Sequence, residues 1–291
     1  MNTALKEEVW GGSADAIQHH YDAGNNFYQK WLDPTMSYSS ALWDDKTERN
    51  NLHQAQLNKH LWHINSAGLK KGGRLLDIGC GWGSQINSFY NIADKHPTSA
   101  VGLTLAKEQK KYAESRGLPG AEFRLESWAD HQPEQMYDGI ISVGAIEHFA
   151  KFQSAHEEKM DVYRTLFERC RSWLDKGSYF SLQSVTYGTL KPKDQNLFIA
   201  HDIFPESELP HTYELFEAAE GLFEITAYRN DRLDYAHTCD LWLRNLQKHR
   251  NVILANEGED MYKRYENYLK LSVAGFLQGK MLLVRLQMKA I

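Results

Sequence analysis

A glycine-rich segment between a buried strand and a helix constrains this chain more than any other feature of its sequence. Residues Arg74–Ile78 are mostly apolar and predict a buried strand, and a Gly-Cys-Gly-Trp-Gly segment, residues 79–83, follows directly. A helix is expected over Ser84–Ala93. Glycine allows the backbone to turn sharply and to approach a ligand closely. Open α/β sheets bind ligands at the carboxyl ends of their strands, so we expect a small-molecule site at this turn.

The chain on both sides of this turn alternates helix-like and strand-like segments. Helices are expected at Asn51–Leu69, Lys107–Arg116 and Lys159–Leu174. Further strands are expected at Ala100–Leu105, Ala121–Leu125, Tyr137–Val143 and Ser178–Val185. Such alternation is typical of βαβ units, and it predicts an α/β fold with a doubly wound parallel sheet.

The pattern changes after residue 186. Tyr187–Pro210 contains three prolines and long polar connections, which predict a lid rather than sheet. Helices expected at about Tyr235–His249 and Asp260–Gly275 separate two strand-like segments, Leu222–Tyr228 and Met281–Met288, which would close the sheet as an antiparallel edge. We therefore predict a single domain with an N-terminal helical cap (residues 1–70), a cofactor-binding core (71–186), and an inserted helical lid with the closing strands (187–291).

Composition and charge exclude several classes of function. The 33 Lys and Arg against 38 Asp and Glu leave a net charge of −5, which argues against nucleic acid binding and against attraction to an anionic bilayer. Cys80, Cys170 and Cys239 are too widely spaced for a CxxC zinc site, and an odd number argues against a disulfide framework. No apolar run is long enough to cross a membrane, and the start lacks the apolar stretch of a secretory signal. We therefore expect a cytoplasmic protein without membrane insertion.

The glycine segment also separates the nucleotide-type cofactors. The GxxxxGK[ST] motif of a P-loop is absent. A dinucleotide fold needs GxGxxG and an acid at the tip of the second strand, but the third glycine position is Ser84, and the second strand ends in Gly102–Leu105. S-adenosylmethionine has no pyrophosphate to hold, and Asp77 could face its amino-acid end. The pattern therefore favours a methyltransferase-type site.

Six spaced segments resemble the cyclopropane fatty acid synthase and mycolic acid methyltransferase family, with which plant benzylisoquinoline N-methyltransferases share a framework. In chain order they are His20–Tyr28, Trp31–Ser39, Leu76–Gly83, Gly102–Gln109, Ser142–His148 and Asp234–Trp242. The resemblance implies a Rossmann-like class I methyltransferase fold that binds S-adenosyl-L-methionine.

The resemblance also implies which residues contact each part of the cofactor. The methionyl part would contact Tyr38, Ser39, Asp77, Gly79 and Gly81, with Cys80 and Gly83 completing the turn. Thr104, Leu105 and Gln109 would take the place of the usual ribose-binding acid. Trp128 would lie beside the adenine, and the segment around Tyr21 would close over the cofactor.

The catalytic residues that the resemblance implies are Glu147, His148 and Tyr235. Cyclopropane synthases hold a bicarbonate ion that removes a proton from the methylated carbocation. Two of its four ligands correspond to Glu147 and Tyr235, but Ser40 stands at the cysteine position and Gln183 at the histidine position, which argues against a bicarbonate site. Glu147 or His148 would then be the base. A pH–rate limb above the ordinary carboxyl value would indicate Glu147, and one near about 6.5 would indicate His148.

The sequence therefore indicates a methyltransferase with a small, largely apolar substrate. C-methylation of an unsaturated acyl, terpenoid or polyketide-like natural product is the first hypothesis, N-methylation of an amine the second, and full cyclopropane formation the third. Ser84 and Thr104 argue against an oxidoreductase, and the retained Glu147, His148 and Tyr235 argue against a silent binding module. The substrate, the methylated atom and a homo-oligomeric state stay open.

Two further groups of side chains have simpler expected roles. His53, His60 and His63 lie on one predicted helix without a cysteine or carboxylate to complete a metal set, so we expect solvated or capping roles and no metal. Aromatic residues are abundant in the lid and the final helices. Ordinary packing is the expectation for each one, although several together would suit an apolar pocket for a cation.

Overall fold

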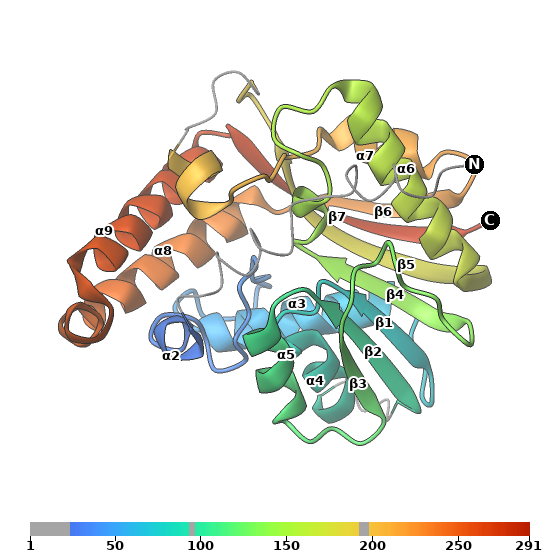
Figure 1. The fold of residues 1–291 in the computed structure, drawn as a ribbon, viewed down its shortest axis with the longest axis horizontal. Helices are drawn as coiled ribbons and strands as arrows, with labels where there is room; N and C mark the ends of the chain where they lie inside the picture. The colour runs from blue at the N-terminus through green and yellow to red at the C-terminus, as the bar shows by residue number, and fades with distance from the viewer. Residues whose placement is uncertain (1–23, 93–96, 192–197) are drawn as a thin grey trace.

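The computed structural model describes residues 24–92, 97–191 and 198–291, so the segment around Tyr21 lies outside the described residues. A seven-stranded sheet with the order β3-β2-β1-β4-β5-β7-β6 forms its centre (Figure 1). The strands are β1 (Arg74–Ile78), β2 (Ser99–Thr104), β3 (Ala121–Leu125), β4 (Tyr137–Val143), β5 (Leu174–Tyr187), β6 (Phe223–Asn230) and β7 (Met281–Ala290). Strands β1 to β5 pair in parallel, which confirms the predicted α/β architecture.

The closing strands β7 and β6 form the antiparallel edge of the sheet that the sequence predicted. Strand β7 is antiparallel to both neighbours and lies inside the sheet, between β5 and β6. Strand β6 forms the edge. The burial of the two strands explains this order, because Leu283–Leu286 of β7 are buried, whereas Tyr228–Asn230 of β6 are exposed.

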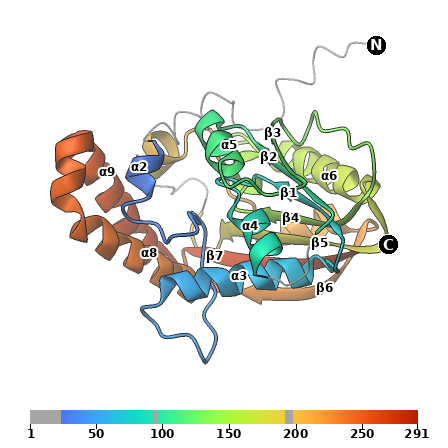
Figure 2. The ribbon, with the colours of Figure 1, turned by 90° about the horizontal axis from the view of Figure 1, so that it is seen from below.

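Helices cover both faces of the sheet and extend beyond one side of it. They are α2 (Asn25–Tyr28), α3 (Leu52–Ser66), α4 (Ser84–Asn91), α5 (Lys107–Glu114), α6 (His156–Ser172), α7 (Thr212–Ala219), α8 (Arg232–Lys248) and α9 (Arg250–Leu277). Helices α3, α4 and α5 contribute to one apolar cluster, and α6 and α7 to the other. Figure 2 shows α8 and α9 as a long helical pair beside the sheet, with α2 close to α9.

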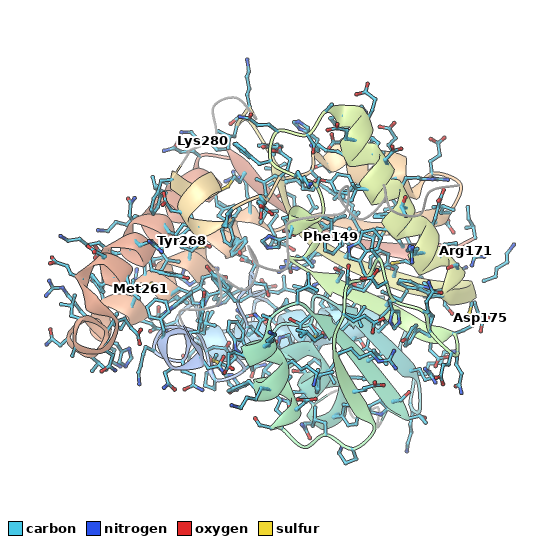
Figure 3. The ribbon with its side chains drawn as sticks, viewed as in Figure 1. Phe149, Arg171, Asp175, Met261, Tyr268 and Lys280 are labelled. Carbon is cyan, nitrogen blue, oxygen red and sulfur yellow. The ribbon has the colours of Figure 1, made fainter. Side chains whose placement is uncertain are left out.

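One helix boundary differs from the predicted one and one helix was not predicted, because strand pairing decides the first and capping the second. Leu174, predicted as the last residue of a helix, is the first residue of β5, where it pairs with Tyr137 of β4. The connection is tight, since Arg171 of α6 donates to the Leu174 carbonyl, and Arg171 and Asp175 lie at the same end of the molecule (Figure 3). Helix α7 was not predicted. It begins after His211, whose backbone N–H donates to the Glu214 carboxylate at 2.8 Å in a capping box.

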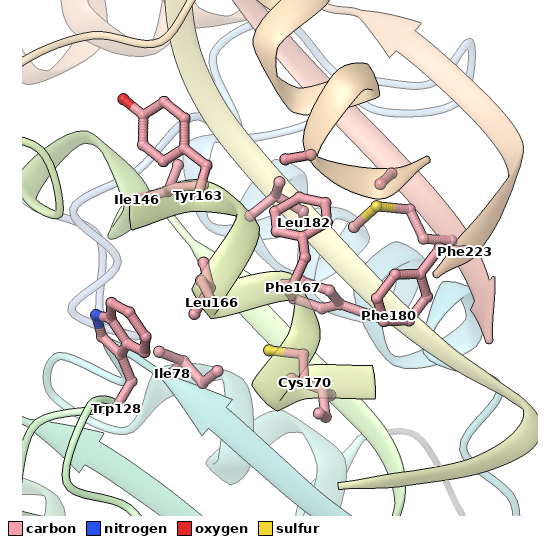
Figure 4. Packing of buried hydrophobic residues seen from close by; sticks show 14 of the residues in the cluster. Ile78, Trp128, Ile146, Tyr163, Leu166, Phe167, Cys170, Phe180, Leu182 and Phe223 are labelled. Carbon is pink, nitrogen blue, oxygen red and sulfur yellow. The ribbon is translucent and has the colours of Figure 1, made fainter. Parts of the chain in front are cut away.

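The core between the sheet and α6 consists of interlocking aromatic and aliphatic side chains (Figure 4). Phe167 of α6 packs edge-to-face against Phe180 of β5, with ring centroids 5.7 Å apart. Ile78 and Leu182 extend the same layer from β1 and β5. Successive strand residues alternate between the two faces, so Leu76 faces α6, whereas Leu75 packs on the side of α3. By the same alternation Asp77 faces the α3 side, at the carboxyl end of β1.

A second, aromatic cluster joins the N-terminal segment to the helical pair. Phe27 packs against Tyr265 of α9 with centroids 4.7 Å apart, and the hydroxyls of Tyr28 and Tyr265 are 2.8 Å apart. Trp31 contacts Trp242 of α8. Helix α9 is interrupted at Gly258, where a φ of 87° breaks the helical geometry. The predicted helices near residues 235 and 260 are thus confirmed, and α9 begins ten residues earlier than expected.

The histidine expectation was wrong for two of its three residues. His60 and His63 are fully buried rather than solvated, because α3 turns this face toward the sheet and the preceding loop. His60 lies between the hydroxyls of Ser37 and Ser88, at 2.9 and 2.7 Å. Burial lowers the pKa of both imidazoles well below 6.5, so both are neutral at physiological pH.

Residues 24–92, 97–191 and 198–291 contain neither a membrane-spanning helix nor a cluster of metal-binding side chains. No helix there is both long enough and apolar enough to cross a membrane. Within the same ranges, no three His, Cys, Asp or Glu side chains are grouped so that they could hold a metal ion.

Candidate active site

The glycine turn between β1 and α4 forms the floor of the predicted cofactor site. Gly79, Gly81 and Gly83 all have positive φ, at 78°, 53° and 74°, a region that side-chain-bearing residues rarely occupy. The surroundings of the three glycines differ. A Cβ on Gly79 would lie 2.5 Å from the Ala145 Cβ, whereas a Cβ on Gly81 would meet nothing closer than Gln109 Nε2 at 4.0 Å. Gly81 therefore borders open space of the kind a ligand would fill.

Gly83 and Cys80 have a packing role in the same turn. A Cβ on Gly83 would lie 2.9 Å from Phe123 and 3.0 Å from Ala113, so this glycine allows α4 to approach the sheet closely. The Cys80 side chain belongs to the apolar cluster beneath α4. Burial raises the pKa of its thiol well above the ordinary value. Cys80 can therefore contact a cofactor through its backbone, but its thiol points into the core.

Asp77 is a buried carboxyl whose Oδ2 atom has no hydrogen-bond partner among the described residues. Burial raises the pKa of Asp77 to about 7, and the nearby Lys59 ammonium opposes the rise. An unpartnered buried oxygen is costly unless a ligand satisfies it. An α-ammonium group would do so, and the open space at Gly81 would admit the ligand. The residues present therefore fit the amino-acid end of S-adenosylmethionine.

The residues predicted at the ribose and adenine lie at the ends of the next strands. Thr104 ends β2, and its hydroxyl donates to Gln109 Oε1 at 2.9 Å, which fixes the amide of this buried glutamine. Leu105 follows Thr104 and is partly buried. Trp128 lies beyond β3, is buried, and packs against Phe149 with ring centroids 5.3 Å apart. No acid stands at the end of β2, as the sequence indicated.

A cavity of about 570 Å³ lies between the carboxyl ends of β4 and β5, the helical pair and the described part of the predicted lid, residues 187–191 and 198–210. All three predicted catalytic residues, Glu147, His148 and Tyr235, line it, together with Tyr38 and Ser39. Most of its wall is apolar, from Val185, Leu190, Ile199, Phe204, Leu209, Leu271, Ala274, Phe276, Met281 and Leu283. Figure 3 locates Tyr268 on α9 and Lys280 before β7, both of which also line the cavity.

Glu147 presents one free carboxylate oxygen within this cavity. It lies in a short 3₁₀ helix (η2, Ile146–His148) after β4 and is buried. Its Oε1 accepts a hydrogen bond from the Val185 backbone N–H at 2.7 Å, whereas Oε2 has no partner among the described residues. Burial raises the pKa of Glu147 to about 7, and the hydrogen bonds from Val185 and Ser184 oppose this rise. The carboxylate is thus held in place by one oxygen and available at the other.

His148 has the opposite electrostatic character. Its Nδ1 atom lies 2.6 Å from the Ser207 hydroxyl of the lid, and its ring packs near Phe204. Burial lowers the pKa of His148 to about 4. This reverses the order expected from the sequence, because the carboxyl now titrates near 7 and the imidazole well below it.

Two residues that correspond to the family's bicarbonate ligands have their polar groups engaged elsewhere. The Ser40 hydroxyl donates to the Ala41 carbonyl at 3.0 Å, and Ser40 is fully buried outside the cavity lining. Gln183 does line the cavity, but its Oε1 accepts from Arg285 Nε at 2.9 Å. A guanidinium can only donate, so the carboxamide oxygen is fixed toward Arg285 and its NH₂ group is left for the cavity.

Several lining residues could not be assigned from the sequence. Tyr268, Leu271 and Ser272 come from α9, and Ser207 comes from the predicted lid. Their spacing within α9 is ordinary helical periodicity, which indicates burial but not the cavity that the buried face lines. Tyr235 stacks on Phe276 with centroids 4.5 Å apart, an interhelical contact with no sequence signal.

Comparison with known proteins shows the family. The family model described as mycolic acid cyclopropane synthetase matches residues 11–286. Cyclopropane mycolic acid synthase 2 of Mycobacterium leprae is 31% identical over 278 residues, which cover 88% of this chain and 87% of that protein. Cyclopropane mycolic acid synthase 1 of Mycobacterium tuberculosis is 32% identical over 275 residues, covering 87% and 89%.

Solved structures agree with this assignment. The cyclopropane synthase MmaA2 of Mycobacterium tuberculosis matches with a TM-score of 0.84 at 28% identity, over 96% of this chain and 99% of that one. The mycolic acid cyclopropane synthase CmaA1, solved with S-adenosylhomocysteine (SAH) and CTAB, matches with a TM-score of 0.83 at 27% identity and the same coverage. Coclaurine N-methyltransferase matches at 0.78 and 18% identity, over 98% of this chain and 86% of that one, which shows the fold alone. This chain belongs to the mycolic acid cyclopropane synthetase family and is a methyltransferase that uses S-adenosylmethionine.

Proposed function

We propose that this enzyme methylates a carbon atom of an unsaturated, largely apolar small molecule, such as an acyl, terpenoid or polyketide-like compound. The observation that carries the proposal is the cavity of about 570 Å³, whose wall is mostly apolar and which holds one carboxylate with a free oxygen, Glu147 Oε2. An apolar substrate would bury its surface there at roughly 25 cal/mol per Å². Its reacting carbon would lie near the only buried carboxylate that lines the described cavity.

The chemistry requires orientation, exclusion of water and a place for one proton. When bound, S-adenosylmethionine would supply an electrophilic methyl group from its sulfonium. The substrate carbon–carbon double bond would form a bond to this methyl carbon as the methyl–sulfur bond breaks, which would leave SAH as a neutral thioether and a cation on the substrate. The ring faces of Tyr235 and Tyr268 would stabilise that cation by roughly 0.5–2 kcal/mol each. Glu147 would then accept a proton at Oε2 while Val185 holds Oε1.

N-methylation of an amine is the second candidate function, and one observation favours it. His148 is neutral at physiological pH and is anchored through Nδ1 to Ser207, so it would tolerate an ammonium-forming substrate nearby. Neutral Nε2 of such a ring can accept a proton from an alkylated amine.

Cyclopropane formation differs from C-methylation only in which proton the base removes, since loss of a proton from the new methyl group closes the ring.

The test follows the transferred carbon. The enzyme is incubated with S-adenosylmethionine whose methyl group is carbon-13, and with a monounsaturated fatty acid, a prenyl alcohol, a secondary amine or an extract of the source cells. NMR of the product distinguishes a carbon-bound methyl group from an N-methyl group and from a cyclopropane ring. We expect a methyl group on carbon, reduced strongly in Glu147→Gln. Label found only on nitrogen or only in a ring would overturn the proposal.

A further inference from the structure

Lys59 is a buried cation that the proposed chemistry does not use. It lies on α3, is 2% exposed, and donates from Nζ to the Ser39 hydroxyl oxygen at 2.9 Å. That is its one hydrogen bond among the described residues. Burying an ammonium is costly unless other groups compensate the charge. The described residues therefore leave part of the hydrogen-bonding capacity of Lys59 unfilled.

Two carboxylates lie close enough to act on Lys59, and they differ in how far they are satisfied. Asp33 already accepts from the Thr35 hydroxyl at 2.8 Å, from the backbone of Thr35, and from the His53 ring. Asp77, on the α3 side of β1, has an Oδ2 atom with no partner in the described part of the chain. The cofactor site thus contains a buried cation and a buried carboxyl, each short of hydrogen-bond partners.

Ser39 connects the cation to the cavity. An ammonium has donors only, so the Ser39 oxygen must accept from Lys59. The hydroxyl hydrogen of Ser39 then points elsewhere, and no described residue accepts it. Ser39 lines the cavity. It therefore offers a donor to a ligand, and the positive charge directly behind that donor favours an anionic acceptor.

We infer that Asp77 and Lys59 together recognise the zwitterionic amino-acid end of S-adenosylmethionine, with Asp77 accepting from the α-ammonium and Lys59 holding the α-carboxylate through the Ser39 hydroxyl. Lys59 is thus a positioning residue that acts through Ser39. The inference concerns the cofactor and does not depend on the identity of the substrate.

The protonation behaviour of the two groups supports this arrangement. Burial lowers the pKa of Lys59 to about 7 and raises the pKa of Asp77 to about 7. Both groups are therefore easily neutralised near physiological pH when no ligand compensates them. A zwitterion brings one charge of each sign, so it stabilises the ionised form of both side chains at once.

The test measures binding by calorimetry with three probes that differ at this end. SAH has both charged groups, its decarboxylated analogue keeps only the ammonium, and methylthioadenosine has neither. Lys59→Met should weaken binding of SAH by about 10- to 100-fold, the effect of one charge-assisted hydrogen bond, and leave the decarboxylated analogue unchanged. Asp77→Asn should weaken the binding of SAH and of the decarboxylated analogue, and it should leave the binding of methylthioadenosine unchanged. Lys70→Met, at an exposed lysine, is the matched control and should change none.

The probes also separate positioning from a general structural role. If Lys59→Met lost affinity for all three probes, or kept full affinity for SAH, the inference would be wrong. Circular dichroism checks that the variant is folded. Should Lys59→Met fail to fold, Lys59→Gln is the second variant, because it keeps a donor for the Ser39 oxygen without the charge and should still lower affinity only for the probe that carries a carboxylate.

Discussion

Arg285 of β7 donates its Nε hydrogen to the Oε1 atom of Gln183 on β5, at 2.9 Å, and both side chains are buried. The same guanidinium donates to Asp231 and to the carbonyls of Ser40 and Ala41. His63 completes the arrangement, with Nε2 at 3.3 Å from the same Gln183 oxygen. Because that oxygen can only accept, His63 must be protonated at Nε2. One buried cation therefore connects β7, β5 and the loop that carries Tyr38 and Ser39, which are predicted to contact the cofactor.

Arg285→Met should destabilise the fold. It would remove one donor each from the Gln183 oxygen and from the Ser40 and Ala41 carbonyls, so we expect a loss of about 3 kcal/mol in the free energy of unfolding, measured by urea denaturation. Arg229→Met is the control, because Arg229 pairs with Asp231 at the surface and should cost less than about 1 kcal/mol. Equal effects from the two variants would contradict a special role for Arg285.

Gly81→Val should abolish cofactor binding with the fold preserved. No protein atom lies within 4 Å of the added Cβ except Gln109 Nε2 at that limit, so the new side chain would occupy the ligand's space. The positive φ adds a strain of roughly 1–2 kcal/mol. Calorimetry with SAH should show no binding while circular dichroism shows a folded chain. Gly83→Val is the contrast, since its Cβ would clash with Phe123 and Ala113 and should impair folding itself. A folded Gly81→Val variant with normal affinity would overturn the predicted floor of the site.

The pH–rate profile should identify the base. If Glu147 accepts the proton, kcat rises with pH through about 7, the value to which burial raises its pKa, because only the ionised carboxylate can act. Glu147→Gln should lower kcat by about 10²- to 10⁴-fold with little change in cofactor affinity. An acid limb of the pH–rate profile near pH 4 that disappears in His148→Ala would instead identify His148 as the base, because burial lowers the pKa of His148 to about 4. Near-normal turnover in both variants would mean that orientation alone carries the reaction.

The same carboxyl should limit stability at alkaline pH. The folded-state pKa of Glu147 is raised from 4.5 to about 7, so the folded chain holds this proton more tightly than the unfolded chain. The stabilisation is present below pH 4.5 and is lost as the pH rises through 7. At about pH 8.5, Glu147→Gln should therefore be more stable than the native chain by about 1–3 kcal/mol, and at about pH 4 the two should be nearly equal. Scanning calorimetry at both pH values measures the difference in stability. A Glu147→Gln variant that is less stable than the native chain at the alkaline pH would contradict the argument.

Bicarbonate should be dispensable. The Ser40 hydroxyl is bonded to the Ala41 carbonyl and the Gln183 oxygen to Arg285, so two of the four positions that correspond to the family's ligands differ in chemistry and have these atoms engaged. Turnover in degassed, bicarbonate-free buffer should equal turnover after bicarbonate is restored. A large, reversible loss would revive the cyclopropane reaction and would assign the Gln183 NH₂ group to the ion.

The local signals that the sequence carries were enough to predict the sheet and the cofactor end of the site. Alternating apolar strands, and the glycines between β1 and α4, depend on backbone geometry over a few neighbouring residues. For that reason the sequence alone predicts that Asp77, Gly79, Gly81 and Thr104 lie at the carboxyl ends of strands. Their contacts with the cofactor stay predictions.

Tertiary structure alone decided the protonation and polarity of the site. Burial depends on what packs against a residue from distant parts of the chain. The sequence predicted only that the pKa of Glu147 would lie above the ordinary carboxyl value, and it gave His148 an ordinary imidazole value, whereas burial brings the two pKa values to about 7 and about 4. His60 and His63, expected at the surface, became buried when α3 packed on the sheet. Lys59 and Asp77 lie 18 residues apart in the sequence and act on each other only because α3 covers one face of β1. Strand and turn patterns are local, whereas charge and proton affinity depend on the whole packed environment.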